Sequence, residues 1–139
     1  MSGFKGMPEE RTEARYRVDF AAQVRTDWQD STPAQVTDLS RHGLRVEGAR
    51  QLVENVFPNF NPPKGTRRPP VDVLFETGQE IGQPAGSVSF SCQTVYVRRV
   101  GADRYQIGLQ FVEIGEASLA LLEQLMLWME EFGTPADLT

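Results

Sequence analysis

The feature that most constrains the fold is a series of short segments in which apolar and polar residues alternate, followed by one helical segment near the end of the chain. Residues 17–25, 71–76 and 105–111 each show a period of two, which is typical of a β-strand with one buried face. Short strands separated by turn residues predict an antiparallel barrel or sandwich rather than a doubly wound parallel sheet. The chain is therefore predicted to be mainly β.

The first half of this pattern predicts three strands. The alternation over residues 17–25 gives the first strand, and a turn is expected over residues 27–33. Two further strands are predicted at residues 34–39 and 44–47, with a tight corner at residues 40–43 between them.

A long irregular segment, residues 49–70, interrupts the alternation and holds five of the nine prolines. Loops of this length inside compact domains are usually functional or disordered. We expect one helical turn in it, around residues 51–56.

The strand pattern after the loop changes phase once. Val88, Phe90 and Cys92 share one phase, whereas Val95 and Val97 follow the other. One extra residue produces such a change, so we predict a β-bulge near Gln93.

The last segment, residues 116–132, has helical periodicity and ends before Gly133 and Pro135, which is a common stop signal. Its apolar surface is wider than a helix needs when it only covers one end of a barrel. Either the whole surface packs on the core, or part of it contacts a loop, a partner or a second copy in a homodimer. The stripe predicted to face the core is Leu119, Leu122, Met126 and Met129, with Leu121, Leu125, Trp128 and Phe132 beside it.

Two short motifs flank the first predicted strand and together predict a site for an anionic purine. Arg11 and Arg15 are four residues apart, and arginine forks bind phosphate or the O6/N7 edge of guanine. In the corner after the second strand, Asp38 can accept from guanine N–H groups and Ser40 can bond phosphate or cap a turn. Gly43 is expected to supply a backbone with φ > 0.

Each motif residue also has an ordinary structural interpretation. The arginines can be surface charges paired with nearby acids, since exposed arginines often are. Asp38 and Ser40 can organise a turn, and Gly43 can complete it. The order and spacing of all these residues together favour a ligand site.

Bulk composition narrows the function further. The 139 residues suit one domain, and 14 Lys and Arg against 19 Asp and Glu make it acidic, which argues against binding duplex nucleic acid. Cys92 is the only cysteine and His42 the only histidine, so no metal or nucleophilic cluster is predicted. The sequence has no leader-like start and no apolar run long enough for membrane insertion, so we expect a cytoplasmic protein. It has no P-loop either, and we expect no catalytic residues and no enzyme activity.

The two motifs, R-x-x-x-R and D-x-S-x-x-G, resemble those of the PilZ domain, a bacterial receptor domain for the second messenger cyclic di-GMP. Residues 105–111 resemble the closing strand of that family, and the resemblance covers roughly residues 10–132. It implies a six-stranded antiparallel, split or Greek-key-like β-barrel with a C-terminal α-helix. We expect a flexible arm at residues 1–10, a domain at 11–132 and a tail at 133–139. The segment at 49–70 departs from the family pattern, in which the connection is usually shorter, so we interpret it as an inserted loop.

The resemblance also implies roles for individual residues. Arg11 and Arg15 would grip guanine edges and phosphates, with Arg17 as a further phosphate contact. Asp38 and Ser40 would contact the base and its sugar-phosphate, while Gly43 would hold the turn. The residue before Arg11 is acidic where many members carry a basic residue, which bears on affinity and on whether one or two ligand molecules bind.

The implied function is a non-catalytic receptor or adaptor with no cofactor and no metal. Cyclic di-GMP would order the N-terminal arginine arm over the barrel and signal to an effector protein in motility, biofilm or exopolysaccharide control. The alternative is a ligand-free interaction module of the same fold that docks on a pilus or secretion assembly.

Overall fold

The computed structural model describes residues 14–27, 29–56 and 70–136. Arg11, the predicted arm and most of the predicted loop lie outside these residues. The elements are, in chain order, β1 (Tyr16–Thr26), β2 (Gln29–Leu39), β3 (Gly43–Gly48), α2 (Arg50–Val56), β4 (Val71–Thr77), β5 (Gly86–Gly101), β6 (Arg104–Ile114), α3 (Glu116–Phe132) and β7 (Thr134–Pro135).

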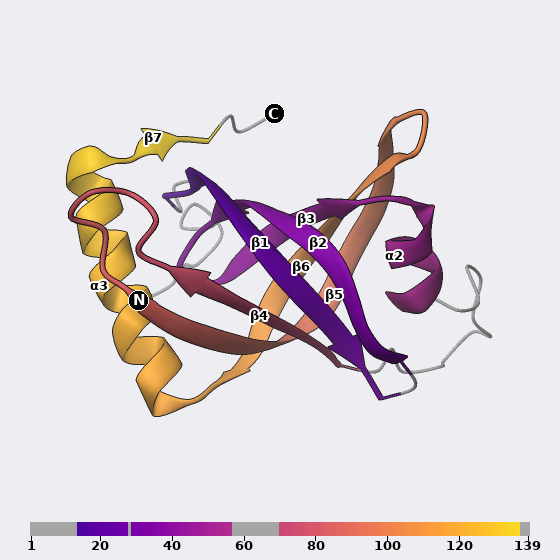
Figure 1. Ribbon diagram of the computed structural model, residues 1–139, viewed down its shortest axis with the longest axis horizontal. Helices are drawn as coiled ribbons and strands as arrows, with labels where there is room; N and C mark the ends of the chain where they lie inside the picture. The colour runs from indigo at the N-terminus through magenta and orange to yellow at the C-terminus, as the bar shows by residue number, and fades with distance from the viewer. Residues whose placement is uncertain (1–13, 28, 57–69, 137–139) are drawn as a thin grey trace, which may run out of the picture.

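Six strands form a closed antiparallel barrel in the order β2-β3-β6-β5-β4-β1, and pairing between β1 and β2 closes it (Figure 1). The two-residue strand β7 adds to the start of β1, where Tyr16 pairs with Pro135. Closure leaves few unpaired strand edges, which protects a small β-domain from edge-to-edge association. The predicted six-stranded antiparallel barrel with a C-terminal helix is confirmed.

The barrel interior is filled by the inward-facing phase of each strand, as the period of two predicts. Val36, Val46, Val73, Phe90 and Ile107 have no exposed surface. A row of aromatic rings crosses this core and links four strands. The successive ring centroids are 4.9 Å apart for Phe20 and Phe75, 5.8 Å for Phe75 and Phe90, and 4.5 Å for Phe90 and Phe111.

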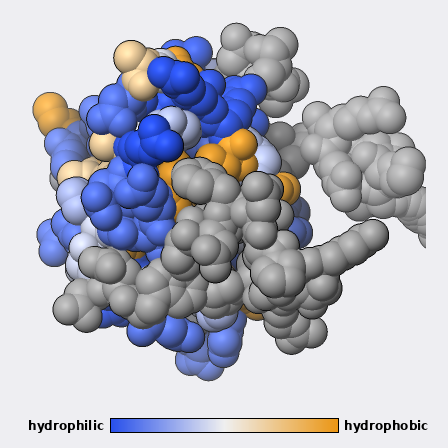
Figure 2. Space-filling model, turned by 90° about the vertical axis from the view of Figure 1, so that its right-hand side faces the viewer, coloured by the Kyte–Doolittle hydropathy of each residue, from blue (hydrophilic) through white to orange (hydrophobic). Residues whose placement is uncertain are grey.

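The two helices of the described residues lie at opposite ends of the barrel, α3 on the left and α2 on the right in Figure 1. Helix α2 buries Leu52, Val53 and Val56. The surface at the α2 end is mostly hydrophilic where its residues are described (Figure 2). Helix α3 spans the predicted range and buries Ser118, Leu122, Leu125, Met126 and Met129.

The predicted core stripe of α3 is partly wrong. Leu119 is 44% exposed, and Ser118 is buried in its place. The other three residues of that stripe are buried as predicted, and the first turn of α3 makes a polar contact with β5, in which the Ser89 backbone N–H donates to the Ser118 hydroxyl over 3.0 Å. Periodicity alone does not reveal such a contact.

The turn expected at residues 27–33 is shorter than predicted, since it lies at Asp27 and β2 already begins at Gln29 and runs through Pro33. Pro33 pairs with Gln23 of β1, whereas pairing with β3 starts only at Gln35. A proline has no N–H to donate, so it fits a strand where one side lacks a partner strand. Pro33 lies in such a stretch.

The β-bulge predicted near Gln93 is present, with register shifts between Ser91 and Cys92 and between Thr94 and Tyr96. The change of phase falls later than predicted, because Thr94 is buried and Val95 is 56% exposed. The expectation that Val95 faces the core was therefore wrong, and a threonine continues the first phase.

Candidate functional site

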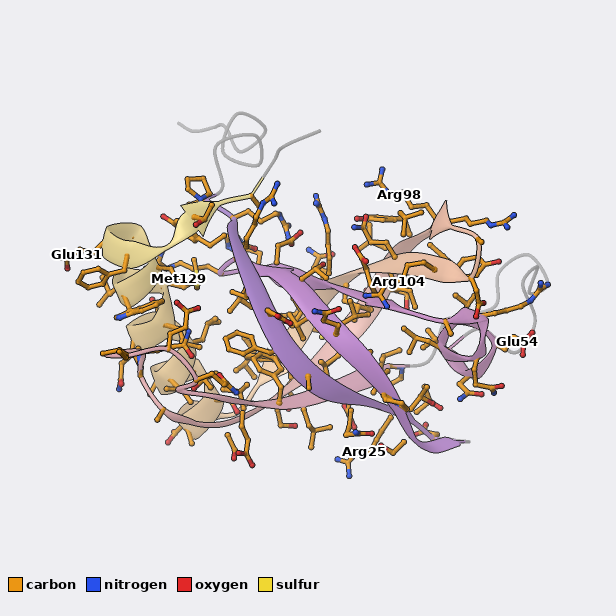
Figure 3. The ribbon with its side chains drawn as sticks, turned by 45° about the horizontal axis from the view of Figure 1, so that its top comes forward. Arg25, Glu54, Arg98, Arg104, Met129 and Glu131 are labelled. Carbon is orange, nitrogen blue, oxygen red and sulfur yellow. The ribbon has the colours of Figure 1, made fainter. Side chains whose placement is uncertain are left out.

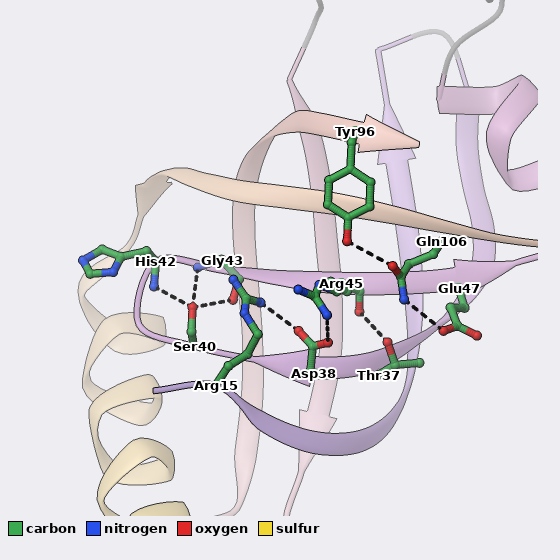
Figure 4. A network of polar contacts seen from close by, with 10 residues as sticks. All are labelled: Arg15, Thr37, Asp38, Ser40, His42, Gly43, Arg45, Glu47, Tyr96 and Gln106. Atoms are coloured by element: carbon green, nitrogen blue, oxygen red, sulfur yellow. Dashed lines mark hydrogen bonds and ion pairs between the residues drawn. The ribbon is translucent and has the colours of Figure 1, made fainter. Parts of the chain in front are cut away.

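Arg15 of the first motif and Asp38 of the second meet on the outer surface of the barrel, where the Asp38 carboxylate is held between two arginines (Figure 4). Arg15 Nη1 lies 2.8 Å from Asp38 Oδ1, and Arg45 Nη1 lies 3.2 Å from Asp38 Oδ2. The Asp38 side chain is 7% exposed and each arginine side chain 20%. We call Arg15, Asp38 and Arg45 the arginine–aspartate cluster.

Strand register explains how the cluster forms. Asp38 of β2 is opposite Arg45 of β3, and on its other side it is opposite Arg17 of β1. Arg15 precedes β1 by one residue and reaches back to the same carboxylate. Antiparallel pairing thus brings residues that are 23 positions apart into direct contact.

The charges of the cluster suit an anionic ligand. A nearly buried carboxylate is costly unless it is paired and hydrogen-bonded, and two guanidinium groups meet that need. The same carboxylate lets two guanidinium groups stay close despite their like charge. One negative and two positive charges leave the cluster cationic, with planar N–H donors that match phosphate or a guanine edge.

Ser40 organises the corner next to the cluster and is fully buried. Its hydroxyl oxygen accepts from the backbone N–H groups of His42 and Gly43, both at 3.2 Å, and its O–H donates to the Gly43 carbonyl. The Ser40 backbone N–H donates to that carbonyl as well, over 2.9 Å. These contacts use the one donor and two acceptor positions of a hydroxyl, so Ser40 fixes the shape of the turn.

Gly43 does not have the conformation expected from the sequence. Among the described residues, positive φ occurs only at Gly78 and Gly82. Gly43 is required for another reason, because a Cβ at this position would clash with the backbone carbonyl oxygen of Leu109 on β6. The turn is held tightly against β6, where the Phe111 N–H donates to the His42 carbonyl over 2.9 Å.

The contacts described above do not include Arg17 or Arg11, the other two arginines predicted for the site. Arg17 is exposed, and it lines a small pocket of about 60 Å³ together with Trp128 and Met129 of α3. Its Cα is in register with Asp38, so it lies beside the cluster. Arg11 lies outside the described residues.

The sequence reasoning missed Arg45. Its place could have been inferred from the four-residue corner, which pairs Leu39 with Leu44 and therefore sets Asp38 opposite Arg45. The outward phase of β3 supports the same conclusion, since Leu44 and Val46 on either side of Arg45 are buried.

A second polar group continues the outer face beyond Arg45 (Figure 4). Tyr96 Oη and Arg98 Nε both donate to Gln106 Oε1, each over 3.0 Å. The Gln106 amide donates in turn to Glu47 Oε2 over 3.3 Å. The Tyr96 ring lies against Gly108, which leaves no room there for a side chain. The surface next to the cluster is therefore polar and carries one fixed aromatic ring.

Other reactive groups lie apart from this surface. Burial, followed by the charge of Asp72, raises the pKa of the Cys92 thiol to about 12, so this thiol is inert near neutral pH. In residues 14–27, 29–56 and 70–136 there is no group of three or more His, Cys, Asp or Glu placed to hold a metal ion. Within the same residues, no helix has the length and apolar character to cross a membrane.

Several solved structures share the fold at low sequence identity. The inhibitor of motility MotI/DgrA from Bacillus subtilis matches with a TM-score of 0.58 and 11% identity over 86% of this chain and 52% of its own. The K. pneumonia MrkH complex with c-di-GMP matches with 0.60 and 13% over 86% and 52%. The c-di-GMP-bound PilZ domain of YcgR from Escherichia coli matches with 0.57 and 14% over 87% and 92%.

The chain thus spans about half the length of the first two proteins and nearly all of the isolated YcgR domain. None of the curated proteins compared with it matches. The family model for the PilZ domain matches residues 9–128, which include both motifs, the barrel and most of α3. This protein therefore belongs to the PilZ domain family.

Proposed function

We propose that this protein is a non-catalytic receptor for cyclic di-GMP. The observation that carries the proposal is the arginine–aspartate cluster beside the glycine turn, at the positions where the two family motifs meet. The solved structures of YcgR and MrkH with c-di-GMP support this choice of ligand, because the same fold holds that ligand there. Cyclic di-GMP carries two phosphates and two guanine bases, and the cluster offers groups for both.

The roles follow from the chemistry of each side chain. Arg11, Arg15 and Arg17 would donate to phosphate oxygens or to guanine O6 and N7. Asp38 would accept from guanine N–H groups, since each carboxylate oxygen can accept more than one hydrogen bond. Arg45 would act as a further donor, because it shares the Asp38 carboxylate with Arg15.

Ser40 and Gly43 would act chiefly by shaping the site. The Ser40 hydroxyl is engaged within its own turn, and Gly43 allows that turn to approach β6. A fixed turn would present the neighbouring cluster in one geometry, which lowers the cost of ordering groups around a ligand.

The signal would pass through the segment that carries Arg15. The Arg15 carbonyl accepts from the Ala136 N–H over 2.8 Å, which ties this arginine to the chain just after α3. Ligand binding would order the N-terminal arm over the barrel and change the surface that an effector protein reads. The setting would be cytoplasmic, in motility, biofilm or exopolysaccharide control.

A second candidate is a ligand-free interaction module docking on a pilus or secretion assembly. The exposed apolar side chains of α3, such as Leu127 and Phe132, favour a protein-binding role of this kind. Both motifs are complete in the sequence, and Arg15, Asp38, Ser40 and Gly43 lie close together in the described residues, which favours the receptor.

A thermal-shift screen with cyclic di-GMP, GTP and cyclic AMP tests the proposal. A ligand that binds only the native state stabilises it by mass action, by about 2.7 kcal/mol when present at a hundred times its Kd. We expect the melting temperature to rise with cyclic di-GMP alone. The proposal fails if cyclic di-GMP has no effect, or if GTP stabilises the protein equally well.

A further inference from the structure

The outer face of α3 carries apolar side chains that the barrel does not cover. Leu127 is 61% exposed and Phe132 64% exposed. Trp128 lies between them on the helix surface, half-buried, with its ring 5.7 Å from that of Phe132. Leu127, Trp128 and Phe132 span about 140° of the helix circumference, with Glu131 between Leu127 and Trp128, and we call this arc the apolar face of α3. An exposed apolar face of this kind commonly marks a protein contact.

Acidic residues border this face. Between Glu113 and Ala136 the chain has five glutamates and no lysine or arginine. Glu116, Glu123 and Glu130 follow one another at seven-residue spacing, so they lie along one side of the helix and form an acidic stripe. A partner for this surface needs apolar side chains flanked by positive charge.

The acidic stripe already holds one cation from the same chain. Arg41, which lies in the turn between Ser40 and Gly43, donates to Glu123 Oε1 over 3.1 Å and to Glu130 Oε2 over 3.2 Å. Burial lowers the pKa of Arg41, but its hydrogen bonds to Glu130 and Glu123 and their charges outweigh burial and raise it overall. The stripe is therefore suited to guanidinium binding.

We propose that the apolar face and acidic stripe of α3 dock a basic amphipathic helix of a partner protein. A partner helix with leucine-like residues on one side and Lys or Arg beside them would cover the apolar face and pair with the stripe. Charge distinguishes a basic helix from the other molecules that could cover this surface. Two copies of the stripe repel each other, and an anionic membrane or nucleic acid is repelled as well.

Arg41 connects this docking surface to the proposed ligand site, and this connection rests on the proposed function. Arg41 belongs to the same turn as Ser40, so a bound phosphate would compete with Glu123 and Glu130 for its guanidinium group. Release of Arg41 would change the net charge of the stripe with its bound arginine from −2 to −3. A basic partner would then bind more tightly.

The docking surface can be tested without nucleotide. The probe is a fluorescein-labelled 14-residue amphipathic helix of leucine and lysine, and the readout is fluorescence anisotropy. The matched counterpart replaces every lysine by glutamate. We expect saturable binding of the lysine peptide only. Leu127→Asp should weaken it about tenfold or more, the effect of losing one central apolar contact in an interface.

Control variants lie at the other end of the molecule. Val100→Asp also places a charge on an exposed apolar residue, and Glu54→Gln removes a charge from α2, far from Glu131 in Figure 3. Both should leave binding within about twofold of the wild type, which is within ordinary scatter for a residue outside the interface. The double variant Glu123→Gln, Glu130→Gln should weaken binding, and Arg41→Ala should strengthen it.

Several results would overturn the inference. Equal binding of the glutamate peptide would show that charge plays no part, and equal losses in Leu127→Asp and Val100→Asp would place the contact elsewhere. A concentration-dependent dimer in light scattering that Leu127→Asp abolishes would assign the face to a second copy. If the lysine peptide behaves as expected while cyclic di-GMP fails to bind, the docking surface stands and only the receptor proposal falls.

Discussion

Replacing Gly43 distinguishes two reasons why a glycine ends the motif turn. If the position required φ > 0, asparagine would be tolerated better than alanine, because asparagine adopts that conformation more readily. If the position lacks room for a side chain, alanine is the milder change and asparagine the more severe one. The structure predicts the second order, since the obstruction is the carbonyl oxygen of Leu109.

The size of the effect follows from the geometry of this contact. The alanine Cβ would lie under 3.0 Å from a backbone atom, whereas ordinary contacts begin at 3.4 Å, so β3 and β6 must separate by several tenths of an ångström or more. That shift stretches the 2.9 Å hydrogen bond from Phe111 N–H to the His42 carbonyl. Overpacking and one weakened hydrogen bond together cost about 2–4 kcal/mol.

The assay is urea unfolding followed by circular dichroism, with Gly115→Ala as the matched control. Gly115 has φ of −67° and no atom within 4 Å of an added Cβ, so its replacement should change stability by about 1 kcal/mol or less. Gly43→Ala should lower the free energy of unfolding by about 2–4 kcal/mol. The reasoning is refuted if Gly43→Asn is more stable than Gly43→Ala, or if Gly115→Ala is as harmful as Gly43→Ala.

Two further predictions concern buried groups. Cys92 keeps its proton in the folded protein because its pKa is about 12 against an ordinary value of 9.0, so the free energy of unfolding should fall as pH rises from 9.0 towards 12. Urea unfolding of wild type and Cys92→Val at pH 8 and 10.5 measures this fall, and an identical pH dependence in both would contradict it. Asp38→Ala leaves two guanidinium groups facing each other and should cost about 1–3 kcal/mol, whereas the exposed Asp27→Ala should cost under about 0.5 kcal/mol. If Asp38→Ala and Asp27→Ala lose the same free energy of unfolding in chemical denaturation, the arginine–aspartate cluster contributes nothing to stability.

The strands were predictable because a barrel wall has one buried and one exposed face, and apolar and polar residues alternate along each strand accordingly. Positions where a strand departs from this alternation could not be predicted. Thr94 occupies an inward position, so the hydrophobic pattern placed the change of phase too early. Pro33 suggested a turn because the sequence does not show that one side of β2 lacks a partner there.

The site was predictable in part for a similar reason. Motif spacing identified the residues of the turn, but it could not show whether position 43 requires glycine for its backbone conformation or for lack of space next to β6. Arg45 belongs to no motif and appears only when strand register is known. Arg41 lies inside the turn motif at a variable position, and its contacts with Glu123 and Glu130 depend on how α3 crosses the barrel end.

The central claim, that the arginine–aspartate cluster binds cyclic di-GMP, is tested most directly by isothermal titration calorimetry. Cyclic di-GMP is titrated into wild type, Arg15→Ala and Arg25→Ala. Arg25 is an exposed arginine near the far end of β1 and serves as the control (Figure 3). We predict saturable heat for wild type and Arg25→Ala, with affinity lower by about tenfold or more in Arg15→Ala, as expected from loss of a charged hydrogen bond. No heat from wild type, or equal affinity in Arg15→Ala, would contradict the claim.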